Sequence, residues 1–233
     1  CYEAPMEITF GNPTIVTGGN GRGKSSLADA IAFAVTGLPF FGERGGMTVS
    51  GGEPLMQPEF LEALLRLAAE AGIRSYIETS GFANADVLAR ISPLTDCFLF
   101  DWKLTDPALH KTYIGVDNSL ILHNLRYLAG QHKRIVLRCP IIPGVNDSEE
   151  NLRQTGLLAR EVGAWELHLL PFHQLGEGKW DNLGMPYECR SCQPPSEAQL
   201  ETAKQQIEAL GVPVNIGGLG IYSGRGDKTH DKS

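Results

Sequence analysis

The sequence predicts an α/β fold in which repeated βα units surround a parallel sheet. Three observations predict it. Short β-branched or aromatic runs alternate with amphipathic runs along the chain. Some short runs, such as Cys97-Phe98-Leu99-Phe100, are apolar throughout, as strands covered on both faces are. Polar residues follow these runs directly, where such folds carry their sites. About seven units fit either an open sheet or an incomplete barrel, and we predict an incomplete barrel of the (β/α)6 type.

The predicted strands are short, and amphipathic runs separate them. The strands are Thr14-Val16, Met47-Ser50, Ser75-Glu78, Cys97-Asp101, Arg134-Cys139, Glu166-Leu170 and Val214-Ile216. The helical runs repeat apolar residues three and four positions apart, as Leu61, Leu64 and Leu65 do. They are Ser25-Val35, Glu59-Ala71, Asn84-Ile91, Asn118-Ala129, Ser148-Val162 and Ser196-Leu210, with a short helix near Pro107.

Glycines and polar residues mark the helix boundaries. Gly72, Gly163 and Gly211 follow three helical runs, where a left-handed residue ends a helix, and Ser196 begins the last run. We predict a P-loop-like segment over 1–44, a partial barrel over 45–218 and a polar tail over 219–233. The loop 171–195 is long, which is typical of a lid or a binding surface.

Composition narrows the function classes. The chain has 233 residues, with 20 Lys+Arg against 27 Asp+Glu, so that a partner held by phosphate neutralisation, such as nucleic acid, is not expected. No apolar run approaches the ~18 to 20 residues of a membrane span and no export leader is evident, which predicts a cytoplasmic protein without a membrane partner. The five cysteines predict free thiols rather than a disulfide framework. Cys97 and Cys139, in apolar strands, are expected in the core.

A phosphate-binding motif lies near the N-terminus. The run from Gly18 to Ser25 satisfies G-x-x-x-x-G-K-[ST] between a predicted strand and a predicted helix. Its backbone N–H groups would form an anion nest, Lys24 would reach the terminal phosphates and Ser25 would bind Mg²⁺ of MgATP. The candidate phosphate-binding residues are Gly18, Gly21, Gly23, Lys24 and Ser25. Residues 7–37 resemble the N-terminal segment of the Rad50/SMC-like ATPases. A Gly-rich turn without catalytic function is the alternative.

Polar side chains follow several predicted strands. They are Ser50, Gly51, Gly52 and Glu53 after one strand, Glu78 and Thr79 at the end of the next, then Asp101 with Lys103, Arg138 and His173. Because the carboxyl ends of parallel strands meet at one edge, these residues predict a single site. Acceptors for an ammonium, cations for a carboxylate and an apolar wall would suit an amino acid that carries an adenosyl group.

Residues 40–218 resemble the glycyl-radical-enzyme activating enzymes, the pyruvate formate-lyase activase group of the radical S-adenosylmethionine (SAM) superfamily. Four segments carry the resemblance: GGMTVSGGEPLMQPEFLEALLRLAAEAGIRSYIETSGF (45–82), CFLFDWKLTDPALHKTYIGVDN (97–118), VLRCPIIPGVNDSEENL (136–152) and ELHLLPFHQLGEGKW (166–180). The resemblance implies a radical SAM oxidoreductase that forms a 5′-deoxyadenosyl radical by reductive cleavage of SAM. The radical would take hydrogen from a glycine of a partner glycyl radical enzyme, and flavodoxin or ferredoxin would donate the electron.

The resemblance also implies roles for single residues. The strand end from Ser50 to Glu53 would bind the methionyl amino group of SAM. Asp101 and Lys103 match the D-x-K motif, and Asp101 with Glu78 or Thr79 would bind a monovalent cation, although the group usually has Asp in place of Glu78. Arg138 and His173 match cofactor-side positions. Asp101, Lys103 and His173 are thus the catalytic candidates, and the loop 174–180 would face the partner.

One element of the resembling group is absent from the sequence. Its [4Fe-4S] cluster is bound by C-x3-C-x2-C, and this chain has cysteines only at 1, 97, 139, 189 and 192. Cys189 and Cys192 could bind a metal ion at a separate site. Two hypotheses therefore stay open: an activase-type radical enzyme, possible only if a cluster assembles, and an ATP-binding module on a scaffold without radical chemistry. A chimeric junction near residues 37–45 would reconcile them.

Overall fold

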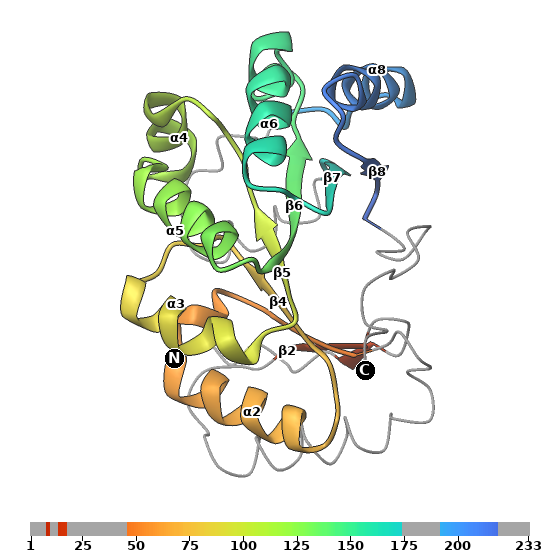
Figure 1. Ribbon diagram of the computed structural model, residues 1–233. Coiled ribbons are helices and arrows are strands. Elements are labelled where there is room, and N and C mark those ends of the chain that lie inside the picture. The colour runs from red at the N-terminus through yellow and green to blue at the C-terminus, as the bar shows by residue number, and fades with distance from the viewer. Residues whose placement is uncertain (1–7, 10–13, 18–45, 174–191, 219–233) are drawn as a thin grey trace.

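The computed structural model describes residues 8–9, 14–17, 46–173 and 192–218. Its strands form one twisted sheet in chain order, and the described helices lie in the connections between β3 and β8 (Figure 1). The strands are β1 (Ile8–Thr9), β2 (Thr14–Thr17), β3 (Met47–Ser50), β4 (Ser75–Thr79), β5 (Cys97–Asp101), β6 (Arg134–Ile141), β7 (Glu166–Pro171) and β8 (Val214–Ile216). Only β1 is antiparallel to its neighbour among these strands, and β2 to β8 are parallel. The predicted α/β class and parallel partial barrel are confirmed.

The helices follow the predicted amphipathic runs. They are α2 (Pro58–Glu70), α3 (Ala85–Ile91), α4 (Pro107–Ile114), α5 (Ser119–Gly130), α6 (Glu149–Glu161) and α8 (Glu197–Glu208), with the short 3-10 helices η2 (Pro54–Met56) and η3 (Ser92–Leu94). Ser196 caps α8, and its partner in the capping box is Gln199. Gly72, Gly163 and Gly211 have positive φ, as the predicted helix ends require.

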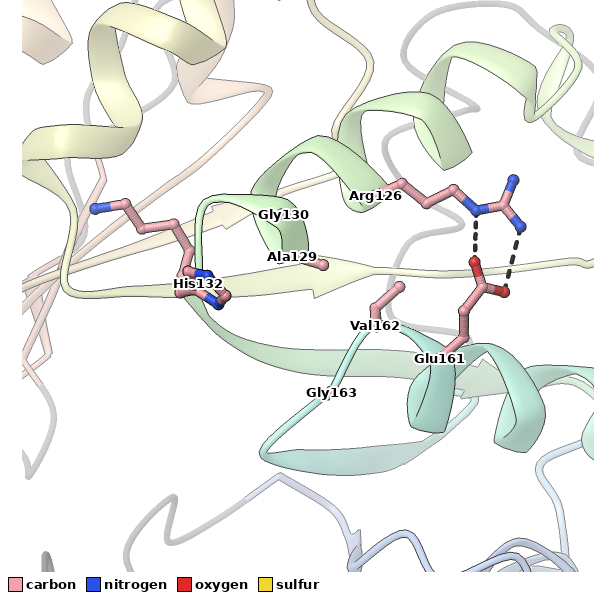
Figure 2. A pocket seen from close by; sticks show the side chains of 8 residues that line it. Arg126, Ala129, Gly130, His132, Glu161, Val162 and Gly163 are labelled. Carbon is pink, nitrogen blue, oxygen red and sulfur yellow. Dashed lines mark hydrogen bonds and ion pairs between the residues drawn. The ribbon is translucent and has the colours of Figure 1, made fainter. Parts of the chain in front are cut away.

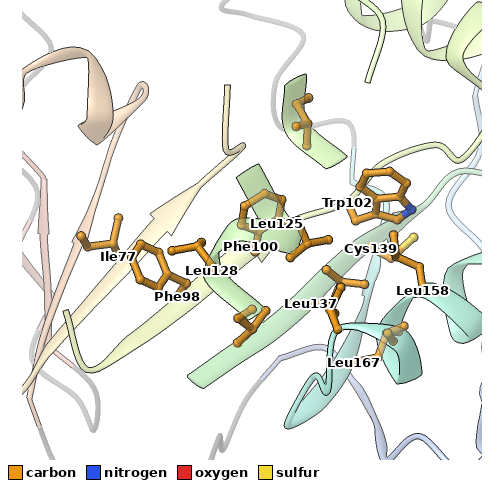
Figure 3. Close-up of a cluster of buried hydrophobic side chains, with 14 of the residues drawn as sticks. Ile77, Phe98, Phe100, Trp102, Leu125, Leu128, Leu137, Cys139, Leu158 and Leu167 are labelled. Atoms are coloured by element: carbon orange, nitrogen blue, oxygen red, sulfur yellow. The ribbon is translucent and has the colours of Figure 1, made fainter. Parts of the chain in front are cut away.

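The two faces of the sheet differ in character. Along β5, Phe98 and Phe100 belong to a large apolar cluster that includes side chains of α2, α5, α6 and α8 (Figure 3). Side chains alternate between faces along a strand, so Cys97 and Leu99 lie on the other face, in a small cluster with Tyr76 and Val136. The helices therefore bury one face, and the second face is free to carry polar groups near the strand ends.

The predicted burial of Cys97 and Cys139 in the core is confirmed. Cys97 and Cys139 are buried, and burial raises the pKa of both thiols to about 12. His168 is packed, with 2% of its surface exposed. In the described ranges, no helix combines the length and the apolar character that crossing a membrane requires.

Other predictions lie outside the described residues. These are the helix over 25–35, the phosphate loop over 18–25 and the polar tail over 219–233. The boundary between residues 44 and 45 stays a prediction, although β2 pairs with β3 from Thr14 against Met47 to Thr17 against Ser50. The two-residue strand β1 was not predicted, because two residues are too short to show an alternating pattern.

Candidate functional site

A row of polar side chains crosses the sheet near its carboxyl edge. The strand register pairs Val49 of β3 with Ile77 of β4, directly before Ser50 and Glu78, and it pairs Asp101 of β5 with Arg138 of β6. The Ser50 hydroxyl donates to Glu78 Oε2 over 2.9 Å, and Arg138 Nη1 lies 2.6 Å from Glu78 Oε1. Arg138 Nε lies 3.9 Å from Asp101 Oδ1. Four predicted site residues thus form one connected group that spans four strands.

Asp101 is the most perturbed carboxyl group of this row. Burial raises its pKa from 3.8 to about 6, and the charges of Arg138 and Lys103 oppose this rise. No hydrogen bond reaches its carboxylate from the described residues, and Arg138 is its ion-pair partner there. A cation that arrived beside Asp101 would find a desolvated carboxylate with open acceptor positions.

The raised pKa makes the stability of the fold depend on pH. The folded chain binds the Asp101 proton more tightly than the unfolded chain, whose value is near 3.8, so protonation favours the folded state. This contribution is fully present below about pH 4 and is lost as the pH rises through about 6. Between about pH 4.5 and 7, urea unfolding of the wild type should lose on the order of 2 kcal/mol more than Asp101→Asn. Equal losses in the two proteins would contradict the assignment.

The two glycines after β3 have a left-handed backbone conformation, which favours glycine over other residues. Gly51 and Gly52 have φ of 95° and 52°, and both are exposed. A Cβ on Gly52 would meet no atom within 4 Å. Left-handed backbone, not crowding, therefore selects glycine at Gly52, and the turn leaves its peptide groups open to a ligand.

Glu53 lies at the base of this turn and joins β3 to β4. Its Oε1 accepts from Thr79 Oγ1 at 2.6 Å, and its Oε2 accepts from the Ser80 amide at 2.8 Å and the Ser80 hydroxyl at 2.6 Å. The Leu55 amide donates to Oε1 at 3.2 Å, so Glu53 also caps η2. Thr79 is 2% exposed, and its register partner Phe100 lies on the helix-covered face, away from Glu78.

The loops after β5 and β6 are held together by buried asparagines. Asn146 Nδ2 donates to the Lys103 carbonyl at 2.9 Å, and Asn146 Oδ1 accepts from the Ile142 amide at 2.8 Å. Asn151 Nδ2 donates to the Asn146 carbonyl at 2.7 Å, while its Oδ1 accepts from the Thr105 amide at 3.0 Å. These bonds fix the backbone of the predicted D-x-K motif, and the Lys103 side chain stays partly exposed.

His173 lies two residues beyond β7 and is exposed. It is at the carboxyl end of a strand, as predicted, but no described contact joins it to the row formed by Ser50, Glu78, Asp101 and Arg138. The predicted partner-facing loop 174–180 lies outside the described residues. The structure thus brings together the residues of β3 to β6, and the role of His173 stays a prediction.

Comparison with known proteins assigns the family. The model of the radical SAM superfamily matches residues 10–155, more than half of the chain. The chain belongs to the radical SAM superfamily. The likeness to a radical SAM methyltransferase from Sphaerobacter thermophilus, at 18% identity and a TM-score of 0.65 over 90% of this chain and 67% of that chain, shows the shared fold.

Several relatives are named as activating enzymes of a decarboxylase or a lyase. The indoleacetate decarboxylase activating enzyme of Tractidigestivibacter scatoligenes is 42% identical over 72% of this chain and 54% of its own length. The pyruvate formate-lyase 2-activating enzyme of Escherichia coli is 35% identical over 82% of this chain and 63% of its own. A domain of pyruvate-formate lyase-activating enzyme from Bacteroides vulgatus has a TM-score of 0.64 at 30% identity, with 75% of this chain and 99% of that chain covered. The chain therefore spans less than two thirds of the length of these curated relatives.

Membership of the radical SAM superfamily implies SAM and a [4Fe-4S] cluster as cofactors. The cysteines that the structure describes do not fit a cluster. Cys97 pairs with Arg134, five residues before Cys139 on β6, which separates the two along the strands by roughly 16 Å. The two thiols also lie in different apolar clusters on opposite faces. Cys189 lies outside the described residues, Cys192 is partly buried, and no cluster of three metal-binding side chains occurs within the described ranges. The metal site at Cys189 and Cys192 stays a prediction.

A buried pair on β7 was not predicted as part of the site. His168 Nε2 lies 3.1 Å from Glu166 Oε2, and the register places His168 beside Arg138. Burial lowers the pKa of His168, the neighbouring Glu166 opposes this, and the charge of Arg138 adds to the lowering. The sequence shows His168 within an apolar strand. Its partner Glu166 is recognised only when the alternation of side chains along the strand is considered, because alternation brings positions 166 and 168 to one face.

A cavity of 620 Å³ lies at the opposite end of the sheet (Figure 2). Its lining comes from the ends of α5 and α6 and from the turns that lead from them into β6 and β7, with His132 and Gly163 in these turns. Arg126 and Glu161 form an ion pair at 2.7 Å on its wall. Because these turns lie at the amino ends of the strands, this cavity is separate from the row at the carboxyl edge.

Proposed function

We propose that the carboxyl edge of the sheet binds SAM. The observation that carries this proposal is the connected row of Ser50, Glu78, Arg138 and Asp101 beside the open Gly51-Gly52 turn. Membership of the radical SAM superfamily supports the same ligand. A zwitterionic methionyl group needs acceptors for its ammonium and a cation for its carboxylate, and both are present at this edge.

The charges of the row suggest which residue would bind each charged group of SAM. Glu78 Oε2 accepts a hydrogen bond from Ser50, and Glu78 Oε1 forms the ion pair with Arg138. Among the described residues, both oxygens keep an acceptor position open. Glu78 and Asp101 would receive the ammonium or a monovalent cation. Thr79 would take no part, because its hydroxyl bonds to Glu53 and it lies on the other face of the sheet. Lys103 would pair with the methionyl carboxylate, and His173 would lie on the cofactor side. Arg138 would neutralise the two carboxylates when no ligand is bound.

We further propose that the chain acts as part of an activating enzyme for a glycyl radical enzyme. Several relatives are named as activating enzymes of this kind, which supports the proposal. One electron, from a donor such as flavodoxin or ferredoxin, and one SAM would give methionine and a 5′-deoxyadenosyl radical. The radical would take a hydrogen atom from a glycine of the partner and leave 5′-deoxyadenosine. The residues described supply the binding of SAM, not the electron.

The proposed SAM site is tested by calorimetric titration of the chain with SAM. The double variant Asp101→Asn with Lys103→Ala should weaken binding by at least about tenfold, because a desolvated acceptor and the cation for the methionyl carboxylate are both lost. Lys111→Ala, at an exposed position of α4, is the matched control and should bind like the wild type. Equal affinity in all three proteins would place SAM elsewhere.

Binding of MgATP at Lys24 is not proposed. The loop from Gly18 to Ser25 lies outside the described residues, and the proteins found by comparison are radical SAM proteins and activating enzymes. An ATP-binding function therefore has no support beyond the sequence motif itself.

A further inference from the structure

We infer that Glu53 is a positioning residue, which fixes the end of β3 against the end of β4 and does not bind the ligand's ammonium. The inference rests on the proposed SAM site and assigns Glu53 a different role from that of Glu78 and Asp101. It follows from the number of hydrogen bonds that each carboxylate already accepts within the described residues.

The carboxylate of Glu53 is fully occupied by its own chain. Each oxygen accepts two hydrogen bonds: Oε1 from Thr79 Oγ1 and the Leu55 amide, and Oε2 from the amide and the hydroxyl of Ser80. A carboxylate offers about four lone-pair positions, so no acceptor position is left for an ammonium. The two hydroxyl contacts of 2.6 Å have the length of bonds to an ionised carboxylate.

The other two carboxylates of the site differ from Glu53. Among the described groups, Glu78 Oε2 accepts a hydrogen bond from Ser50, Glu78 Oε1 forms an ion pair with Arg138, and Asp101 is reached by Arg138 alone, at 3.9 Å. An ammonium can therefore approach Glu78 or Asp101 without displacing an existing hydrogen bond. At Glu53 it would have to displace a bond from Leu55, Thr79 or Ser80.

The bonds of Glu53 hold the backbone on both sides of the ligand site. Through the Leu55 amide, Glu53 caps η2, which directly follows the Gly51-Gly52 turn. Through Ser80 and Thr79, it holds the start of the next turn, where the Gly81 amide donates to Thr79 Oγ1 at 2.9 Å. Loss of one bond should therefore loosen both turns and weaken every ligand that contacts them.

The test uses two ligands that differ only in the amino group, S-adenosylhomocysteine and its desamino analogue. Calorimetry with Glu53→Gln, which replaces one acceptor oxygen by a donor of the same shape, should show both ligands weakened by the same factor, about tenfold. Loss of affinity for S-adenosylhomocysteine alone would overturn the inference, because it would mean that Glu53 binds the ammonium.

Two further variants keep the test decisive if Glu53→Gln fails to fold. Ser80→Ala removes one donor from Glu53 and should weaken both ligands equally, whereas tighter or unchanged binding of S-adenosylhomocysteine would overturn the inference. Glu78→Gln is the matched control, and it should weaken S-adenosylhomocysteine more than the desamino analogue. If the wild type binds neither ligand, the proposed function fails and this inference fails with it. Selective loss in Glu53→Gln overturns the inference alone.

Discussion

Arg138→Leu is expected to destabilise the fold by about 2 kcal/mol and to abolish detectable SAM binding. The substitution leaves the carboxylates of Glu78 and Asp101 without their shared cation in a partly desolvated site. Removing one partner of a fully buried pair costs about 3 to 5 kcal/mol. The value expected here is smaller because the side chains of Arg138 and Glu78 are still 19% and 29% exposed to solvent.

Urea unfolding at pH 7 and calorimetric titration with SAM would measure the two effects of Arg138→Leu. Arg66→Leu is the matched control, since Arg66 pairs with Glu62 on the surface of α2 at 59% exposure. Its loss should cost about 0.5 kcal/mol or less. A stability change in Arg138→Leu as small as that of the control would show that Arg138 does not neutralise the site.

Gly81→Ala is expected to lower the free energy of unfolding by about 3 kcal/mol. Gly81 has φ of 72°, and a Cβ there would overlap the ring of Phe100, which is fully buried. Left-handed backbone costs alanine about 1 kcal/mol, and overpacking of a core costs a further 1 to 3 kcal/mol. The turn would also shift the neighbouring Ser80, so the affinity for SAM should fall as well.

Gly144→Ala is the control that separates the cost of left-handed backbone from the cost of steric overlap. Gly144 has a similar φ of 79°, but a Cβ there would meet no atom within 4 Å. Its substitution should cost only about 1 kcal/mol. Combining Gly81→Ala with Phe100→Leu should destabilise less than the sum of the two single changes, because the smaller side chain relieves the overlap. Equal losses in the two glycine variants would exclude the steric argument.

Most elements of the fold were predictable because they carry a local signal, which the two-residue strand β1 lacks. The bounds of β3, β5 and β8 were predicted correctly, since β-branched and aromatic runs end at turn residues. The strand β6 continues through Pro140 to Ile141, two residues beyond its predicted end at Cys139. A proline ordinarily argues against the interior of a strand. Here the neighbouring parallel strand β7 extends as far as β6 does, and Pro140 pairs with Leu170.

The residues of the site were predictable, but their partners were not. Strand-end polar residues such as Glu78 and Arg138 are visible in the sequence. Their ion pair depends on the register across three strands, which no local pattern encodes. Glu53 was expected to bind an ammonium because it is an acceptor at a strand end that resembles the SAM-binding motif. Its bonds to Thr79 and Ser80, 26 and 27 residues further along, come from the packing of one turn against the next.

The asparagine bonds between the loops after β5 and β6 have a consequence for motion. Lys103, Asn146 and Thr105 are joined through Asn151 into one network of backbone and side-chain bonds. A displacement of the Lys103 backbone must therefore carry Asn146 with it or break the bond between Asn146 Nδ2 and the Lys103 carbonyl. The two loops are thus coupled at the rim of the barrel. At the proposed SAM site, the Lys103 side chain would adjust to a ligand more freely than its backbone.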